Sequence, residues 1–222
     1  MDNFQKLNNY LSKIEEINQN KNDSETLFYL KKIEEEIVNN KDFYEIFEIL
    51  SQEYNKTYQV LALYKQISNI ITSSNNFENF LKNLFKVIIF ELNGESTSVM
   101  IYNNSNRKLE MLSYFNIKRG FKFVYGKEDK TTFKIGEGIA GKVAKYKEPI
   151  IVDQTNKSKD FIRKTDVEIN SLICLPLQYN NELIGTLNLS HIDTSVYNEE
   201  HINILKLIAS IISLKAVLYG YC

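Results

Sequence analysis

The chain has few side chains of the types that carry out catalysis or bind metals. Its only thiols are Cys174 and Cys222, which allow at most one disulfide and no cysteine-rich metal site. His191 and His201 are ten residues apart with no histidine or cysteine between them, whereas zinc sites use three or four nitrogen or sulfur ligands. No phosphate-binding Gly-Lys-Ser/Thr turn and no nucleophile elbow are present. The sequence therefore predicts no catalytic residues, no metal and no cofactor, and haem ligation by His191 is the alternative left open.

The composition is that of a folded protein without a strong charge. Of 222 residues, 43% are hydrophobic, which is enough for a sizeable core, and the formal net charge is −1, so no basic excess favours nucleic acid or an anionic membrane. Apolar runs such as Leu172–Leu177 are much shorter than the roughly 20 residues of a membrane-spanning helix. The first 20 residues lack the apolar stretch of a secretory signal. We expect a cytoplasmic protein with neither nucleic acid nor membrane as a partner.

The first third of the chain is predicted to be helical. Residues 2–72 contain no proline or glycine, and apolar residues recur at helical spacing, so residues 1–60 are assigned to a helical N-terminal region, interpreted as three helices. The segment at 41–72 has a heptad-like apolar stripe, in which Phe47, Leu50, Tyr54 and Leu61 are included. This stripe fits a helix packed on its own domain or a coiled coil with a second subunit, and the second interpretation is favoured.

Residues 61–222 are predicted to form a second domain, in which helical spacing gives way to extended segments. An amphipathic helix is expected at 77–92, a short helix at 138–145 and a closing helix at 198–219. Short β-type runs are expected at 96–102, 109–115, 121–125, 133–135, 149–152, 171–177 and 183–189. The fold class is therefore α+β, with a central sheet flanked by helices.

The closing helix is apolar nearly all round. One side carries residues spaced 3, 4, 3, 4, 3, namely Ile202, Leu205, Ala209, Ile212, Ala216 and Tyr219. The opposite side carries Ile204, Leu207, Ile208, Ile211 and Leu214. A helix of this kind must be buried on several sides, so we expect the sheet on one side and helices, including those of a second subunit, on the other. Ile212 and Ala216 are assigned to the dimer interface.

The run from Phe133 to Asp153, FKIGEGIAGKVAKYKEPIIVD, closely resembles the glycine-rich turn, short helix and strand of GAF domains. Ser171–Leu177 and Glu182–His191 resemble the last two strands of that family, and Tyr197–Glu200 resembles the start of its closing helix. The resemblance extends over roughly residues 64–219. It implies a central antiparallel sheet with the terminal helices on one face, a ligand cleft on the other, and dimerisation through those helices.

The resemblance also selects candidate ligand contacts at segments that border the cleft in GAF domains. They are Ile139, Asp153, Phe161, Asn170, Ser171 and Asn188. A signature of cyclic-nucleotide-binding members is incomplete, because Asn156-Lys157 and Phe161 are present but the acidic pair is displaced to Asp166 and Glu168.

Three functions remain as hypotheses. The leading one is a regulatory GAF sensor that binds a small molecule and, as a homodimer, signals through its terminal helices. Because no kinase, cyclase or DNA-binding module follows Cys222, a separate effector protein or the helical region is expected to receive the signal. A dimerisation or scaffold module whose cleft is filled by Phe121, Phe123, Tyr125 and Phe161 is the alternative. The third, free methionine sulfoxide reduction, needs a cysteine cluster, and Cys174 is interpreted as a core residue.

Overall fold

The computed structural model describes residues 59–126 and 130–221, together with residues 9, 13, 28 and 30–33. The chain divides into two compact units, Met1–Ala62 and Leu63–Cys222, two residues from the boundary expected between the domains. The described residues of the first unit are helical. The predicted interface positions Phe47, Leu50 and Tyr54 lie outside the described residues.

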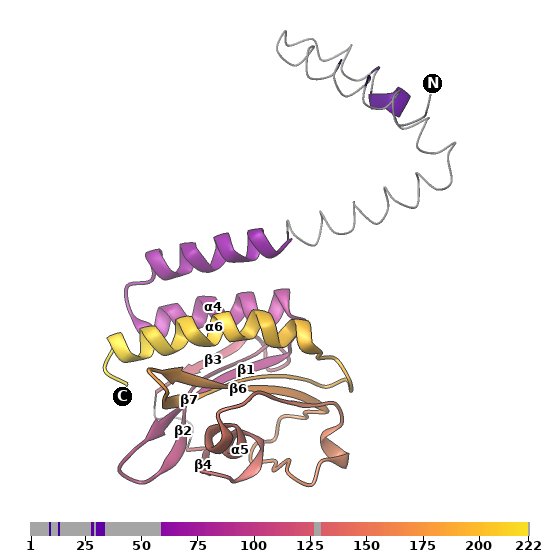
Figure 1. Ribbon diagram of the computed structural model, residues 1–222. Helices are drawn as coiled ribbons and strands as arrows, with labels where there is room; N and C mark the ends of the chain where they lie inside the picture. The colour runs from indigo at the N-terminus through magenta and orange to yellow at the C-terminus, as the bar shows by residue number, and fades with distance from the viewer. Residues whose placement is uncertain are drawn as a thin grey trace. The chain divides into compact units, whose positions relative to one another are not determined.

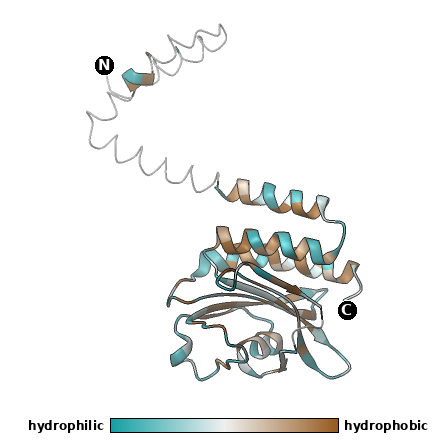
Figure 2. Ribbon diagram, turned by 180° about the vertical axis from the view of Figure 1, so that it is seen from behind, coloured by the Kyte–Doolittle hydropathy of each residue, from teal (hydrophilic) through white to brown (hydrophobic). Residues whose placement is uncertain are grey.

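Helices lie on one side of the second unit. A helix at residues 59–73 is followed by α4 (Phe77–Glu91), and α6 (Glu199–Leu218) closes the chain. An asparagine caps the N-terminus of both α4 and α6. The side chain of Asn76 accepts a hydrogen bond from the Asn79 N–H, and that of Asn198 accepts from the N–H groups of residues 200 and 201. Leu63 and Ile67 of the first helix are buried in the same core as α4 and α6. Figure 2 shows hydrophobic residues recurring along these three helices.

Seven strands form one antiparallel sheet beneath these helices. They are β1 (Ser96–Asn103), β2 (Lys108–Asn116), β3 (Lys122–Tyr125), β4 (Thr132–Lys134), β5 (Ile150–Val152), β6 (Ser171–Tyr179) and β7 (Glu182–His191). Their order is β3-β2-β1-β7-β6-β5, with β4 paired to β2. The two predicted hairpins, β1–β2 and β6–β7, are confirmed. The pairing of β1 with β7 brings the two hairpins together at the centre of the sheet.

The alternation of side chains along the strands divides the core in two. Helices α4 and α6 cover one face and α5 (Gly138–Tyr146) covers the other, as Figure 1 shows. Val99, Leu187 and Leu189 point to the larger core on the side of α4 and α6. Met100 and Leu172 point to the smaller core around α5. The predicted α+β fold with an antiparallel sheet and flanking helices is confirmed.

The assignment of Ile212 and Ala216 to a dimer interface is wrong for these two side chains. Both are 0% exposed, because they lie on the side of α6 that packs against the chain's own core. Leu61, the remaining predicted interface position, is 59% exposed. On α6 the most exposed apolar residues are Leu207, Leu214 and Leu218, whereas Ile208, from the opposite set, is 0% exposed in the same core.

Within the described residues, α6 is the one helix long and apolar enough to cross a membrane by length and composition. The criterion of uninterrupted apolar runs missed this property, because Lys206, Ser210 and Lys215 interrupt the helix. In the structure the inner face of α6 packs against β6 and β7.

Candidate ligand-binding site

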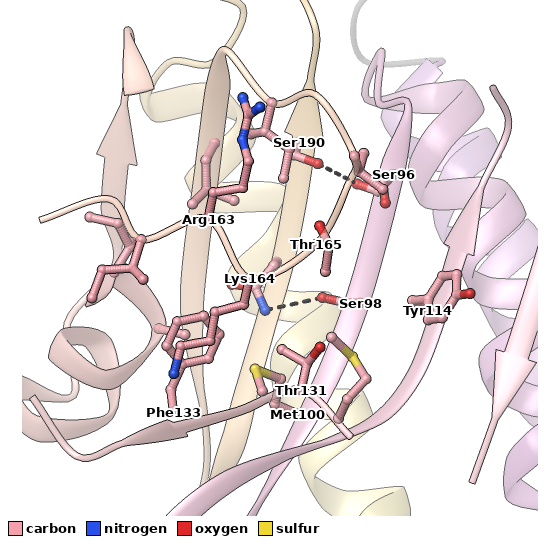
Figure 3. A pocket seen from close by; sticks show the side chains of 18 of the residues that line it. Ser96, Ser98, Met100, Tyr114, Thr131, Phe133, Arg163, Lys164, Thr165 and Ser190 are labelled. Atoms are coloured by element: carbon pink, nitrogen blue, oxygen red, sulfur yellow. Dashed lines mark hydrogen bonds between the residues drawn. The ribbon is translucent and has the colours of Figure 1, made fainter. Parts of the chain in front are cut away.

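A cleft of about 350 Å³ lies on the sheet face opposite α4 and α6. Its floor comes from β1, β2 and β7, one wall from α5 and β4, and its roof from residues 161–169, called the roof segment below. Figure 3 shows the side chains that line it. The volume is at the lower end of the range of roughly 300–1,000 Å³ for small-molecule sites, so the cleft suits a small metabolite.

Three rows of side chains run across the floor, set by the strand pairing. Ser96 of β1 is paired with Ser190 of β7. The second row is Tyr114, Ser98 and Asn188, and the third places Met100 beside Met111. Side chains two residues apart share a face of β1 and of β7, and a bulge in the β1–β2 pairing places Met111, three residues from Tyr114, on the same face, so all these residues face the cleft. The floor changes from hydroxyl and amide groups at one end to thioethers at the other.

The polar floor groups are only partly engaged with one another. The Asn188 amide donates to Ser98 Oγ at 3.2 Å, and Ser190 Oγ donates to the Ser96 carbonyl at 3.4 Å. The Tyr114 side chain also lines the cleft, and its hydroxyl forms no hydrogen bond to a described residue. A serine hydroxyl has one donor and two acceptor positions, so the row retains hydrogen-bonding capacity for a ligand.

The glycine-rich turn places α5 against the floor. Gly138 has φ +65°, in the left-handed region that favours glycine, and a Cβ at Gly141 would overlap the Lys134 carbonyl oxygen. The turn is closed by the Glu137 carboxylate, which accepts from the Lys134 N–H at 2.7 Å. It therefore brings Ile139 of α5 into the apolar end of the cleft.

One ion pair and two further contacts of Lys164 hold the roof segment against the wall. Lys164 Nζ lies 2.6 Å from Glu137 Oε1, donates to the Thr132 carbonyl at 2.7 Å, and lies 4.3 Å from the centre of the Phe133 ring. The Lys134 N–H and the Lys164 ammonium lower the pKa of Glu137, so the pair is intact at neutral pH and is lost only as the pH falls through that lowered value. These contacts hold Lys164 of the roof segment against the wall of the cleft.

The substitution Glu137→Gln is expected to loosen the roof segment without unfolding the protein. The pair between Glu137 and Lys164 is partly exposed and contributes up to about 1 kcal/mol, so local opening becomes up to about fivefold more frequent. Hydrogen exchange of the amides at 161–169 measures this. Glu148→Gln, at an exposed glutamate after α5, is the matched control and leaves exchange unchanged. Equal exchange in wild type and Glu137→Gln would show that the pair does not hold the roof.

Three of the six predicted contacts line the cleft: Ile139, Phe161 and Asn188. The other three do not. Ser171 is fully buried and alternates with the cleft residue Leu172, so its side chain lies on the helix side of the sheet.

Asn170 and Asp153 are backbone anchors instead of cleft residues. The Asn170 carbonyl accepts from the Thr155 N–H at 2.9 Å and its N–H donates to the His191 carbonyl at 2.9 Å. The Asp153 carbonyl accepts from the Ser195 N–H at 2.9 Å, and its side chain is exposed in a separate surface depression beside β5. Both were selected because they adjoin cleft-bordering segments, and adjacency in sequence did not place them in the cleft.

Sequence reasoning missed most of the floor and the roof. The missed lining residues include Ser96, Ser98, Met100, Met111, Tyr114, Arg119, Phe133, Arg163, Lys164, Thr165 and Ser190. A signal existed for Ser190, because it shares a strand face with Asn188. The residues of β1 could be found only once the pairing of β1 with β7 was known.

Cys174 lies in the core and the two histidines bind the backbone of their own chain, while Cys222 lies outside the described residues. Burial raises the pKa of the Cys174 thiol, which is 0% exposed and is not part of the cleft lining. Among the described residues no three His, Cys, Asp or Glu side chains are placed to hold a metal. His191 accepts the Asp193 N–H at 2.9 Å, and His201 completes the cap of α6.

Comparison with known proteins agrees with this architecture. The family model described as the GAF domain matches residues 76–214, more than half of the chain. No curated protein matches the chain in sequence.

Solved structures similar to this chain are GAF domains and enzymes built on the same fold. The GAF domain of a phosphoenolpyruvate-protein phosphotransferase from Coxiella burnetii has a TM-score of 0.64 at 19% identity, over 74% of this chain and 98% of that chain. The corresponding domain from Acinetobacter has a TM-score of 0.60 at 16% identity, over 74% and 98%. Free methionine-R-sulfoxide reductase from Neisseria meningitidis, in complex with its substrate, has a TM-score of 0.57 at 15% identity, over 71% and 86%. The likeness to these structures shows the fold, and the match to the family model shows that the chain belongs to the GAF domain family.

Proposed function

We propose that this protein is a cytoplasmic, non-catalytic sensor that binds a small molecule in the cleft and signals through its terminal helices as a homodimer. The observation that carries the proposal is the open cleft of about 350 Å³, whose floor carries hydroxyl groups that retain hydrogen-bonding capacity. The half-buried Ser96, Ser98 and Tyr114 side chains place hydroxyl groups there that can still donate a hydrogen bond to a ligand or accept one from it.

The placement of the large aromatic residues supports ligand binding over a scaffold with a filled cleft. Of the four candidates for filling it, only Phe161 lines the cleft. Phe123 and Tyr125 pack against the core on the helix side, where the Tyr125 and Tyr221 hydroxyls are 2.6 Å apart. Phe121 is 61% exposed and stacks on Phe90 of α4, with ring centres 6.5 Å apart.

The position of Cys174, the one thiol within the described part of the chain, supports a role other than catalysis. Several similar structures are free methionine-R-sulfoxide reductases, and a thiol-based reduction requires a thiolate that can reach the substrate. Cys174 is fully buried, with a raised pKa, and it is absent from the cleft lining. The surroundings of Cys174 therefore favour a binding protein.

The central strands β1 and β7 contact both the cleft and the core beneath the helices, so they can transmit a ligand-induced change from one to the other. Ser98 and Asn188 face the cleft, while the neighbouring Val99, Leu187 and Leu189 pack in the core formed by α4 and α6. A ligand that binds two arrangements of these strands with different affinity shifts the population between two helix packings. We propose that a separate effector protein receives this change.

We place the dimer contact on the outward apolar stripe of α6, formed by Ile204, Leu207, Ile211, Leu214 and Leu218. The spacing of 3, 4, 3, 4 is that of a coiled-coil seam, and Leu214 and Leu218 are 47% and 70% exposed.

Leu214→Lys is expected to raise the dissociation constant of the dimer tenfold or more without unfolding the subunit, because a charge enters the centre of an apolar contact. Analytical ultracentrifugation measures the constant, and Asn104→Lys, on the exposed β1–β2 turn, is the control. A wild-type protein that is monomeric, or a variant that dimerises as well as wild type, contradicts this interface.

The ligand itself is tested by mass spectrometry of the natively purified protein under non-denaturing and denaturing conditions. We expect a small molecule at about one per subunit, released on denaturation. A ligand-free protein that also fails to bind any compound in a screen of nucleotides and metabolites would contradict the sensor function and leave the scaffold alternative.

A further inference from the structure

The cleft is polarised along the strand direction. The Ser96–Ser190 row lies at one end and the Met100–Met111 row at the other, four residues along β1, which corresponds to roughly 13 Å. Figure 3 shows Arg163 at the end with Ser96 and Ser190, and Phe133 at the end with Met100. A ligand that satisfies both ends must be elongated, polar at one end and apolar at the other.

We propose that the ligand is an amphipathic organic oxyanion. Its carboxylate or phosphate head binds at Ser96, Ser190, Arg119 and Arg163, and its apolar body lies among Met100 and Phe133. The proposal rests on the proposed sensor function and adds the chemical class of the ligand.

The charges of the lining residues support an anion. Arg119 and Arg163 line the cleft, and within the described residues neither guanidinium has an ion-pair or hydrogen-bond partner. Lys164, the third basic residue of the lining, is already paired with Glu137. Asp166 is the single carboxylate among the lining residues, so the cleft keeps a net positive charge. An anion gains from this charge and a cation does not.

The presence of arginine instead of lysine in the cleft lining is a second, independent observation. The sequence has 27 lysines and arginines, of which only Arg107, Arg119 and Arg163 are arginines. Two of these three line the same cleft, although lysine supplies nearly all of the positive charge elsewhere. The planar guanidinium donates two parallel hydrogen bonds to a carboxylate or phosphate, which the lysine ammonium cannot do.

A neighbouring chamber limits where the head group can bind. This chamber of about 190 Å³ shares Ser96, Arg119, Asp166, Val167 and Ser190 with the cleft, but Glu95 and Glu168 also line it. Glu95 is paired with Lys118 at 3.1 Å, which leaves no uncommitted positive charge there beyond Arg119. The oxyanion therefore remains on the cleft side of Arg119, over the serine row.

The test compares three probes with the same apolar body on the full chain: 3-phenylpropionate, 3-phenylpropyl phosphate and the neutral 3-phenylpropanol. Isothermal titration calorimetry or NMR titration at millimolar concentration measures their affinities. We expect at least one anion to bind tenfold or more tightly than the alcohol, and the better of the two identifies the head group.

The double variant Arg119→Gln/Arg163→Gln is expected to bind all three probes with the weak affinity of the alcohol. Arg107→Gln, at the remaining arginine on an exposed turn, keeps the preference of the wild type. Unchanged alcohol binding in the double variant shows that its cleft is intact. The proposal is overturned if the alcohol binds wild type as tightly as the anions, if the double variant keeps the preference, or if no probe binds.

The ligand class and the sensor function can fail separately. A neutral or cationic compound that co-purifies with the protein would reject the oxyanion and leave the sensor function standing. A cleft that binds nothing in either experiment would reject both.

Discussion

The substitution Ile212→Lys is expected to destabilise the folded subunit by about 5 kcal/mol and to lower its Tm by roughly 10–20 °C. Ile212 is 0% exposed, on the face of α6 that packs in the larger core. Truncating a buried isoleucine alone removes about 2–5 kcal/mol, and the lysine adds an ammonium group without a partner in an apolar site. Since domains have a total stability of about 5–15 kcal/mol, a large fraction of the variant is unfolded at physiological temperature. Thermal unfolding followed by circular dichroism measures the change.

Leu214→Lys, two residues further along the same helix, is the matched control for this prediction. Leu214 is 47% exposed, so the same introduced side chain reaches solvent and lowers the Tm only through the weaker dimer, by much less than Ile212→Lys does. The pair separates folding from association, because Ile212→Lys acts on the fold and Leu214→Lys on the proposed dimer. A folded Ile212→Lys variant with the Tm of the wild type would place Ile212 outside the core.

The contrast between these two positions shows what periodicity can and cannot predict. The 3, 4 spacing of apolar residues predicted the helix at 198–219 to within a residue or two of α6. The helix is apolar on both sides, so spacing could not decide which side faces the sheet. That choice depends on the strands beneath, where Leu175 and Leu187 contribute to the core that receives Ile208 and Ile212.

The candidate site was predicted less completely than the fold, for a related reason. Ile139, Phe161 and Asn188 were found because they lie within or beside the motif-bearing segments. The serine row joins β1 to β7, strands that are about 90 residues apart in sequence and that only the long-range pairing brings together. Arg163 and Lys164 lie in an irregular segment, where no periodicity indicates the direction of a side chain.

The pairing of β1 with β7 also predicts a large loss of stability when Gly185 is replaced by alanine. A Cβ at this position would overlap the Met100 carbonyl oxygen and lie 3.0 Å from the Met100 carbonyl carbon and 3.1 Å from Ile101 Cα. All three atoms belong to the backbone of the neighbouring strand and cannot rotate away. The substitution Gly185→Ala therefore forces β1 and β7 apart at the apolar end of the cleft floor, and we expect a loss of about 3 kcal/mol.

Gly120→Ala provides the control for Gly185→Ala, because the same methyl group is added in a different setting. Gly120 has φ +74° and nothing within 4 Å of the added Cβ, so only the left-handed conformation is penalised, by about 1 kcal/mol. Urea unfolding of the two variants measures the difference, and binding of 3-phenylpropionate to Gly185→Ala tests whether the cleft floor has moved. Stabilities that are equal in the two variants would mean that β1 and β7 are not in the close approach that brings Ser98 and Asn188 together on one floor.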